Sequence, residues 1–519
     1  MNQTKDVTIA TRPNPRFRLD SPLSMRAIQF VISLAIVVVS VLPLARFVAT
    51  ALARIGYPYD LEWCEGGTLG HIRVVLAGQH IYREPSFEFT PYIYPPLYYY
   101  VSALVSLFVG AGHLAPRLVS FISILGCFVL LARWVRDETD DPVAGVAAVG
   151  LLSAIYQLTG YWFELARVDA FFLLLVFSSH MLARTATTDR RAALVGVLIA
   201  AACFTKQLGI PLAVPALVLL LLRSFRLAVV AASVSGVLVL VTGLAFSIST
   251  HGWFLYYVLD LPSRHQIQWE RFWPSAQTFF LSTTFPLTLG GLLMICGLGF
   301  GRRAWKRWLF HALFVGLAVT TSFLPFLKSG GYPNGLIPAY AALALAGGIG
   351  IGAVRRARSP LGPLGPSLAV CAALALQFAV LDYDGKAALP SPDDLESNQK
   401  VMSRLEALPK PLFVTGSSFY TMTAGDQPIM ADTMALIDIF KGGGEQSEHL
   451  RQVMGDAIRQ HRFKTIVTDR VVGFLPEDIV NLIRQEYTPS GTVLHGLPPD
   501  VIWQKSGASL RPDTVWVAR

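Results

Sequence analysis

The chain has 519 residues, of which 53% are hydrophobic and only 15% are charged, and its formal net charge is +9. Soluble proteins carry about 25% charged residues, so this composition excludes a soluble globular protein and predicts an integral membrane protein. The positive charge does not indicate a nucleic-acid-binding protein, because arginine and lysine stand in short clusters between apolar runs. The five cysteines show no spacing typical of a metal or redox site.

The first apolar run extends from residue 27 to about residue 52 and follows a tail rich in basic residues. A cleavable signal peptide would explain the small residues at 49–51. However, the run exceeds the usual ~7–15 residues of a signal-peptide core. The sequence therefore predicts an uncleaved first span preceded by a cytoplasmic tail, residues 1–26.

Further apolar runs predict spans at residues 116–134, 142–159, 168–183, 192–205, 208–222, 227–249, 276–301, 308–327, 332–354 and 364–381. Basic clusters stand between them: Arg133, Arg136, Arg184, Arg190, Arg191, Arg223, Arg226, Arg302, Arg303, Lys306, Arg307, Arg355, Arg356 and Arg358. All of these fall on one side if the aromatic-rich segment 94–109 is an interfacial helix that does not cross. The positive-inside rule then predicts about eleven spans, with the N-terminus inside and the C-terminus outside.

The chain after residue 381 is polar, and residues 382–519 are predicted to form a small α/β domain outside the membrane. Prolines and acidic residues around Pro390 and Pro392 predict a linker at its start. Short β-rich runs predict strands at 411–416, 427–432, 464–469 and 492–496, and helical spacing predicts helices at 447–463 and 476–487. Glycines 442–444 are interpreted as a flexible connector, because no Lys-Ser/Thr follows in phosphate-loop spacing.

The chemistry is expected where spans meet the outer surface. Asp60 and Glu62 follow the first span, Arg167 and Asp169 begin a later one, and Lys206 lies between two spans. Charged groups at membrane depth are costly and usually functional when they face a cavity. A carboxylate can take the proton of an attacking hydroxyl, and a cation can neutralise a departing phosphate. Each residue could instead be an interfacial anchor or half of a structural ion pair.

The order of these motifs resembles the first outer loop of the GT-C glycosyltransferase superfamily. The resemblance is closest to the bacterial branch of protein mannosyltransferases and aminoarabinose transferases. An apolar span is followed by the acidic cluster "YDLEWCEGG", then by Gly78, Tyr82 and "YPPLYYY". The similarity continues through "ELARVDAFFLLL", "FTKQLGIPLAVPALVLLLL" and "KSGGYPNGLIP". It implies a GT-C transmembrane domain over residues 27–381, with an outer loop at 56–115.

Enzymes of this superfamily take a sugar from a polyprenyl-phosphate carrier and transfer it outside the membrane to a hydroxyl of a lipid, glycan or protein. The resemblance thus implies an inverting glycosyltransferase of a bacterial inner membrane, with membrane lipids and no nucleic acid as partners. The alternative is a polytopic transporter or flippase of lipids or small molecules. Against it, the charges gather at one face and the sequence shows no inverted repeat.

Three groups of site residues are expected. Asp60 is the preferred general base, Glu62 is the second choice, and Asp169 is a further catalytic carboxylate. The carrier phosphate is expected at Arg167, Lys206 or Lys328, with a reserve set of Arg83, Arg264 and Arg271. Donor or acceptor contacts are expected from Glu65, Tyr94, His265, Tyr332 and Asn334.

Other roles stay open for some of these residues. Glu65 could instead pair with Arg73 or cap the following helix. No cofactor is expected as a requirement, although Asp60, Glu62 and Asp169 could hold a divalent cation if they converge. His251 and His265 lack the spacing of metal ligands.

Overall fold

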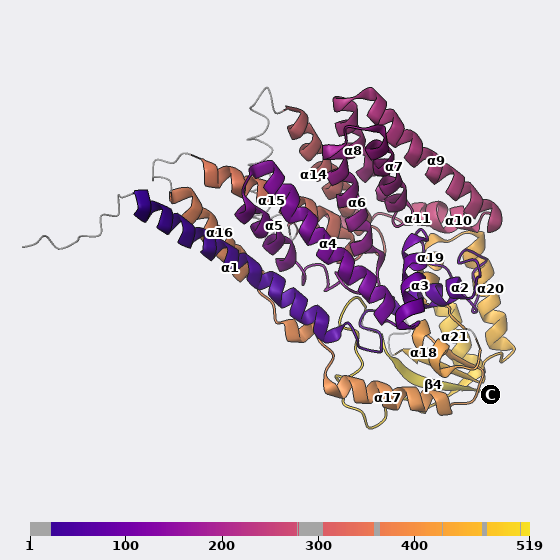
Figure 1. Ribbon diagram of the computed structural model, residues 1–519. Coiled ribbons are helices and arrows are strands. Elements are labelled where there is room, and N and C mark those ends of the chain that lie inside the picture. Colours follow the sequence, from indigo (N-terminus) through magenta and orange to yellow (C-terminus); the bar gives the residue numbers. More distant parts are fainter. Residues whose placement is uncertain are drawn as a thin grey trace, which may run out of the picture.

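The computed structural model describes residues 22–277, 279, 305–357, 364–427, 429–469, 475–508 and 510–519. A slanting bundle of long helices forms most of the molecule, and the C-terminal elements gather at one end of it (Figure 1). Residues 1–21, most of the predicted span 276–301 and the basic residues Arg302, Arg303 and Arg358 lie outside the described residues.

The remaining predicted spans all form helices close to their expected bounds. They are α1 (Pro22–Arg54), α4 (Leu114–Thr139), α5 (Pro142–Ala154), α6 (Val168–Thr185), α7 (Asp189–Cys203), α8 (Gly209–Arg223), α9 (Phe225–Ser249), α14 (Trp305–Phe326), α15 (Ile337–Arg356) and α16 (Gly365–Val380). Within the described chain, five helices are long and apolar enough to cross a membrane, or six if one bent pair counts as a single span. The larger number of about eleven spans stays a prediction.

Small residues let the bundle helices approach closely, as is common among membrane helices. A Cβ on Gly150 of α5 would lie 2.6 Å from the carbonyl oxygen of Ser40 on α1. A Cβ on Gly196 of α7 would lie 2.5 Å from the carbonyl oxygen of Ala231 on α9. The backbones at these crossings therefore touch, and a larger residue would push the helices apart.

The segment predicted as the first outer loop, residues 56–115, contains two helices, α2 (Glu65–Leu76) and α3 (Leu97–Val109). One face of α3 is buried through Tyr98 and Tyr99, while Leu107 and Phe108 are 68% and 82% exposed. An apolar exposed face on a short helix suits the interfacial position that the charge pattern predicts for this segment.

Shorter helical turns border the other outer segments. Between α9 and residue 277 the chain forms α10 (Trp253–Leu255), η1 (Tyr256–Asp260), α11 (Leu261–Arg264), η2 (Trp269–Arg271) and α12 (Phe272–Gln277). A further turn, η4 (Pro333–Leu336), leads into α15. Main-chain bonds join two of these segments, because the Gln268 amide donates to the Leu327 carbonyl and the Ser329 amide donates to the Gln266 carbonyl.

The C-terminal α/β unit has one mixed sheet. Its elements are η5 (Gly385–Ala388), α17 (Pro392–Ala407), β1 (Leu412–Val414), α18 (Ser418–Ala424), α19 (Thr433–Gly442), α20 (Glu445–Arg459), β2 (Thr465–Asp469), α21 (Glu477–Glu486), β3 (Tyr487–Thr492) and β4 (Pro512–Ala518). The strand order is β1-β2-β4-β3. The β1–β2 pair is parallel and the two pairs that involve β4 are antiparallel.

Three local predictions for this unit were wrong. The described residues of 427–432 form no strand, because Asp432 instead caps α19 by accepting from the Met434 amide. The segment 492–496 is mainly a turn that follows β3. The predicted linker contains the start of α17, where Ser391 and Asp394 form a capping box.

The C-terminal unit packs tightly against the first outer loop (Figure 1). The ring of Phe87 lies 5.1 Å from Phe413 and 4.9 Å from Phe463, and the carbonyl of Phe87 accepts from the Met430 and Ala431 amides. These buried aromatic side chains belong to one shared apolar core. The unit is therefore joined to the loop and is not a loose appendage.

The topology can be tested by cysteine labelling. Trp269 is 62% exposed in the predicted outer segment, and the Asp140 side chain is 94% exposed in the predicted inner turn between α4 and α5. In intact cells, a membrane-impermeant maleimide should label Trp269→Cys and should spare Asp140→Cys until the membrane is opened. The reverse pattern would invert the topology.

Candidate functional site

A cavity of about 240 Å³ lies where the predicted outer segments of the bundle meet the C-terminal unit. Its wall combines aromatic side chains with a group of cations, and one carboxylate borders it. The polar and aromatic residues that line it include Trp63, Tyr94, Trp162, Arg167, Lys206, Gln207, His265, Phe326, Lys328, Ser329, Tyr332, Asn334 and Asp438. A concave site of this kind, with few polar groups converging on it, is the usual form of a ligand site.

Arg167 is the most deeply buried cation of the wall, with only 6% of its surface exposed. Its guanidinium lies over the rings of Tyr94 and Trp162, at 5.5 Å and 5.6 Å from their centroids, and it donates to the Tyr94 hydroxyl at 3.2 Å. Its Nε finds no hydrogen-bond partner within the described chain. A buried guanidinium with an unused donor suits an anionic ligand.

Lys206 is held at the cavity by a neighbouring carboxylate. Its Nζ donates to Asp169 Oδ1 at 2.6 Å, and Asn334 Nδ2 donates to Asp169 Oδ2 at 2.9 Å. The predicted catalytic residue Asp169 thus has both oxygens occupied and positions two cavity residues. Three separate segments of the bundle, the start of α6, the turn before α8 and η4, meet at this carboxylate.

Lys328 and His265 also line the cavity. Lys328 Nζ donates to the carbonyl of Pro262 at 2.8 Å. His265 Nε2 donates to the carbonyl of Asp438 at 3.2 Å and lies 3.8 Å from its Oδ1. Burial lowers the pKa of His265, which favours the neutral imidazole.

Glu62 is fully buried beside the cavity residues Trp63 and Cys64. Its Oε2 accepts from the Cys64 amide at 3.0 Å, and its Oε1 has no hydrogen-bond partner within the described chain. Burial raises the pKa of Glu62 to about 8, although the charge of Arg167 opposes the rise. The C-terminal unit covers this carboxylate, because a Cβ on Gly507 would lie 3.2 Å from Oε1.

Glu65 has a structural partner that its sequence neighbours do not reveal. It pairs with Arg117 through two hydrogen bonds, of 2.8 Å from Nε and 2.5 Å from Nη2. It also accepts from the amides of Leu61 and Ala166. Burial would raise the pKa of Glu65, but the guanidinium of Arg117 outweighs it and lowers the pKa to about 2. The expected pairing with Arg73 is wrong, because Arg73 donates to the Met422 carbonyl.

Asp60 lies in a different environment. Its Oδ1 is 2.7 Å from His113 Nε2 and its Oδ2 accepts from the Ser417 hydroxyl. It borders a separate small cavity beneath the C-terminal unit, together with residues such as Asp394 and Ile502. Both oxygens of the preferred base are therefore engaged outside the main cavity.

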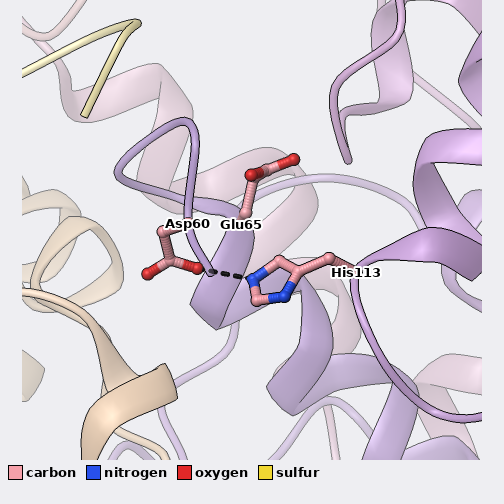
Figure 2. A group of neighbouring side chains, drawn as sticks. All are labelled: Asp60, Glu65 and His113. Carbon is pink, nitrogen blue, oxygen red and sulfur yellow. Dashed lines mark hydrogen bonds and ion pairs between the residues drawn. The ribbon is translucent and has the colours of Figure 1, made fainter. Parts of the chain in front are cut away.

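A divalent cation would not find Asp60, Glu62 and Asp169 together. Within the described chain, the carboxylates and histidines close enough to share an ion are Asp60, Glu65 and His113. Figure 2 shows the imidazole directed at Asp60, while the carboxylate of Glu65 points away from both residues. Because Glu65 is already paired with Arg117, a metal ion bound here would have to break a buried ion pair.

Arg83, Arg264 and Arg271, the alternative candidates for the carrier phosphate, are not among the residues that line the cavity. Arg264 pairs with Asp260 at 2.7 Å, and Arg83 stacks over the ring of Phe89 at 4.9 Å from its centroid. Arg271 donates to the carbonyls of Lys328 and Gly331 and thereby stabilises the main chain of a segment that lines the cavity. By contrast, Tyr94, Tyr332 and Asn334 line the cavity, and their contacts with a donor or acceptor stay a prediction.

Sequence reasoning missed three residues of this region: Arg117, His113 and Asp438. Arg117 and His113 had no acidic neighbour in the sequence to signal a partner. Asp438 carried a signal, because it lies between two isoleucines in the apolar run of α19. Burying an acid is costly unless the carboxylate is paired or hydrogen-bonded, so an acid within an apolar run marks a position to inspect.

Comparisons with known proteins agree with this architecture. The sequence model of the family described as dolichyl-phosphate-mannose-protein mannosyltransferase matches residues 94–253. The fold is similar to crystal structures of ArnT from Cupriavidus metallidurans, one bound to undecaprenyl phosphate and one in the apo state. Both have a TM-score of 0.56 and 13% identity; the alignments cover 91% and 96% of this chain and 97% and 98% of those chains.

The fold is also similar to the Archaeoglobus fulgidus oligosaccharyltransferase in complex with Zn and sulfate. The TM-score is 0.50 with 11% identity, over 89% of this chain and 71% of that chain. A comparison with curated proteins finds no matching sequence. At such identities the likeness concerns the fold, and it extends over nearly the whole chain.

The Glu65–Arg117 pair should dominate the stability of the outer loop. Arg117→Met leaves a buried carboxylate unpaired, which should lower the free energy of unfolding by roughly 3–5 kcal/mol in detergent micelles. The folded-state pKa of Glu65, about 2, lies below its ordinary value of 4.5. Its contribution is therefore fully present above pH 4.5 and is lost as the pH falls toward 2.

A matched control is Arg451→Met, which removes a more exposed pair with Asp478 and should cost less than about 1 kcal/mol. Glu65→Gln should abolish the part of the pH dependence of stability that Glu65 contributes between pH 4.5 and 2. Equal losses for Arg117→Met and Arg451→Met would contradict the assignment.

Proposed function

We propose that this chain, a member of the GT-C superfamily of membrane glycosyltransferases, transfers a sugar from a polyprenyl-phosphate carrier to a hydroxyl acceptor outside the membrane. The observation that carries the proposal is the cavity at the outer ends of the spans, where Arg167, Lys206 and Lys328 converge. The mannosyltransferase family match and the fold shared with an undecaprenyl-phosphate-bound ArnT support it. The bundle and the C-terminal unit together align with the two ArnT structures over more than nine-tenths of this chain.

The carrier phosphate is proposed to bind between Arg167 and Lys206. The aromatic rings of Tyr94 and Trp162 hold the guanidinium of Arg167 in place, so little side-chain entropy is lost when an anion binds. Asp169 fixes Lys206 in the same wall. The lipid tail would remain in the bilayer while its phosphate reaches this outer cavity.

The proposed reaction is a displacement at the anomeric carbon. The acceptor oxygen forms the new bond, and the bond between that carbon and the phosphate oxygen breaks with inversion. The phosphate leaves with the electron pair, and its charge is neutralised by the surrounding cations. A carboxylate is needed to take the hydroxyl proton.

Two acids of the first outer loop, Asp60 and Glu62, are proposed to contribute to this step through their positions near the cavity. Asp60 holds His113 and Ser417 and so joins the loop to the C-terminal unit. Glu62, buried beside Trp63 and Cys64, lies close to the cavity wall and keeps an unused oxygen. The choice of Asp60 as the base stays a prediction, which Asp60→Asn tests through turnover. The proposed location is the bacterial inner membrane, with the cavity outside.

Arg167→Gln and Lys206→Gln should each weaken binding of undecaprenyl phosphate. Loss of one charge-assisted hydrogen bond costs about 1.5–3 kcal/mol, which corresponds to roughly 10- to 150-fold in Kd. Arg167→Lys should also bind poorly, because an ammonium cannot reproduce the planar fork between two rings. Binding can be measured by microscale thermophoresis or native mass spectrometry of the purified protein.

Arg264→Gln is the control for these variants, because Arg264 carries the same charge on an outer segment but pairs with Asp260 away from the cavity. Its affinity should match that of the native chain. If all the cavity variants bind the carrier normally, the phosphate site lies elsewhere and this proposal fails.

A further inference from the structure

We infer that Asp438, which the C-terminal unit contributes to the cavity, binds hydroxyls of the donor sugar and selects a single neutral sugar unit. The inference rests on the proposed function and names the class of its substrate. Asp438 lies on α19 and borders the same cavity as Arg167 and Lys206, where the carrier phosphate is proposed to bind. The membrane bundle would hold the phosphate, and the C-terminal unit would recognise the sugar.

The carboxylate of Asp438 is free to bind a ligand. Within the described chain no hydrogen bond reaches it, because His265 Nε2 lies 3.8 Å from Oδ1 and donates instead to the main-chain carbonyl of Asp438. Only 4% of the residue is exposed. A buried carboxylate without hydrogen-bond donors is unfavourable, and the hydroxyls of a bound sugar would supply these donors.

The pKa of this carboxyl reflects the same lack of donors. Burial raises the pKa of Asp438 to about 7, and the charges of Lys441 on its own helix and of Arg167 from the start of α6 oppose the rise only in part. Hydrogen bonds to the charged form of an acid favour that form. Sugar hydroxyls at this position would therefore stabilise the carboxylate at neutral pH.

The neighbouring acids already hold protein groups. Both oxygens of Asp169 accept from side chains of the bundle, and Asp438 is the acid among the cavity-lining residues of the described chain. Asp60, whose oxygens hold His113 and Ser417, stays the candidate base. Binding of the sugar by Asp438 does not compete with that role.

Aromatic rings next to the proposed phosphate site offer a surface for the sugar ring. The centroid of Tyr332 lies 5.4 Å from that of Trp63 and 5.7 Å from that of Trp162, and all three residues line the cavity. The guanidinium of Arg167 lies over Trp162. A sugar has C–H groups on its faces and hydroxyls at its edge, so one face can pack on these rings while the edge meets a polar group.

The volume and the charge of the cavity restrict the sugar. Its volume of about 240 Å³ is below the roughly 300–1,000 Å³ of sites for drug-sized ligands, which favours one sugar unit over an oligosaccharide. Arg167, Lys206 and Lys328 are matched in charge by Asp169, Asp438 and the phosphodiester of the donor. A neutral sugar keeps this balance, whereas an amino sugar would add an unmatched positive charge.

The experiment measures how much the sugar adds to the affinity for the carrier. Purified protein in detergent is titrated, without acceptor, with undecaprenyl-phosphate glucose, mannose and arabinose, and with undecaprenyl methyl phosphate, a phosphodiester that has no sugar. At least one sugar donor should bind the native chain more tightly than the methyl ester. Asp438→Ala should weaken binding of that donor by about 10- to 150-fold, the usual loss for a hydrogen bond to a charged group. Its affinity for the methyl ester should stay equal or rise slightly.

Three further variants control this result. Asp438→Asn, which keeps the size of the side chain, should cause a smaller loss, because a neutral hydrogen bond is roughly half as strong as a charge-assisted one. Lys206→Gln should weaken binding of the sugar donor and of the methyl ester by the same factor. Asp456→Ala should change neither, since Asp456 is an exposed acid of the same unit that pairs with Arg459.

Monodeoxy analogues of the best-bound donor test for direct contact. At least one analogue should bind the native chain more weakly than its parent, and Asp438→Ala should no longer distinguish the two, because the contact is already lost. Undecaprenyl-phosphate glucosamine should bind no more tightly than the glucose donor.

The inference is overturned if no sugar improves binding to the native chain, or if Asp438→Ala binds the sugar donors normally. Equal losses for the sugar donor and the methyl ester, additive losses in the deoxy series, or tighter binding of the glucosamine donor through Asp438 also overturn it. The proposed function is judged separately, by the release of undecaprenyl phosphate when membrane lipid extract is added as acceptor. It fails if the native chain binds these carriers and releases none.

Discussion

The buried ion pair between Glu65 and Arg117 fixes the first outer loop against the helical bundle. Taking both charges out of water is costly, so the pair is favourable only because further hydrogen bonds complete it. Arg117 also donates to the carbonyls of Tyr57 and Tyr59, and Glu65 accepts from the Ala166 amide. The loop is thereby held beside the start of α6. Trp63 and Arg167 consequently face the same cavity.

The cavity depends on elements that are far apart in the sequence. The start of α6 supplies Arg167, the turn before α8 supplies Lys206, and the segment after α14 supplies Lys328. The C-terminal unit closes the remaining side. Its contacts with the loop, such as the bond from Tyr92 to Asp432 at 2.9 Å, set the position of α19 and therefore of Asp438.

The acids and the cations around the cavity have different roles. Buried acids that pair with cations hold the scaffold, as Asp169 does for Lys206, while Arg167 keeps an unused donor. The wall is left with a net excess of cationic groups that a phosphate can neutralise. The aromatic neighbours of Arg167 lower the local polarity, which strengthens such contacts.

The helices were predictable because a span needs about 20 apolar residues and each run is local in the sequence. The sequence also determined that Arg167, Lys206 and Lys328 stand at span ends, because the charges interrupt apolar runs there. It could not determine which acid borders the cavity. That choice depends on pairings such as Glu65 with Arg117, 52 residues apart, and on the packing of α19 against the outer segments. Only the tertiary structure brings these groups together, since an ion pair forms from proximity in space and leaves no local pattern in the chain.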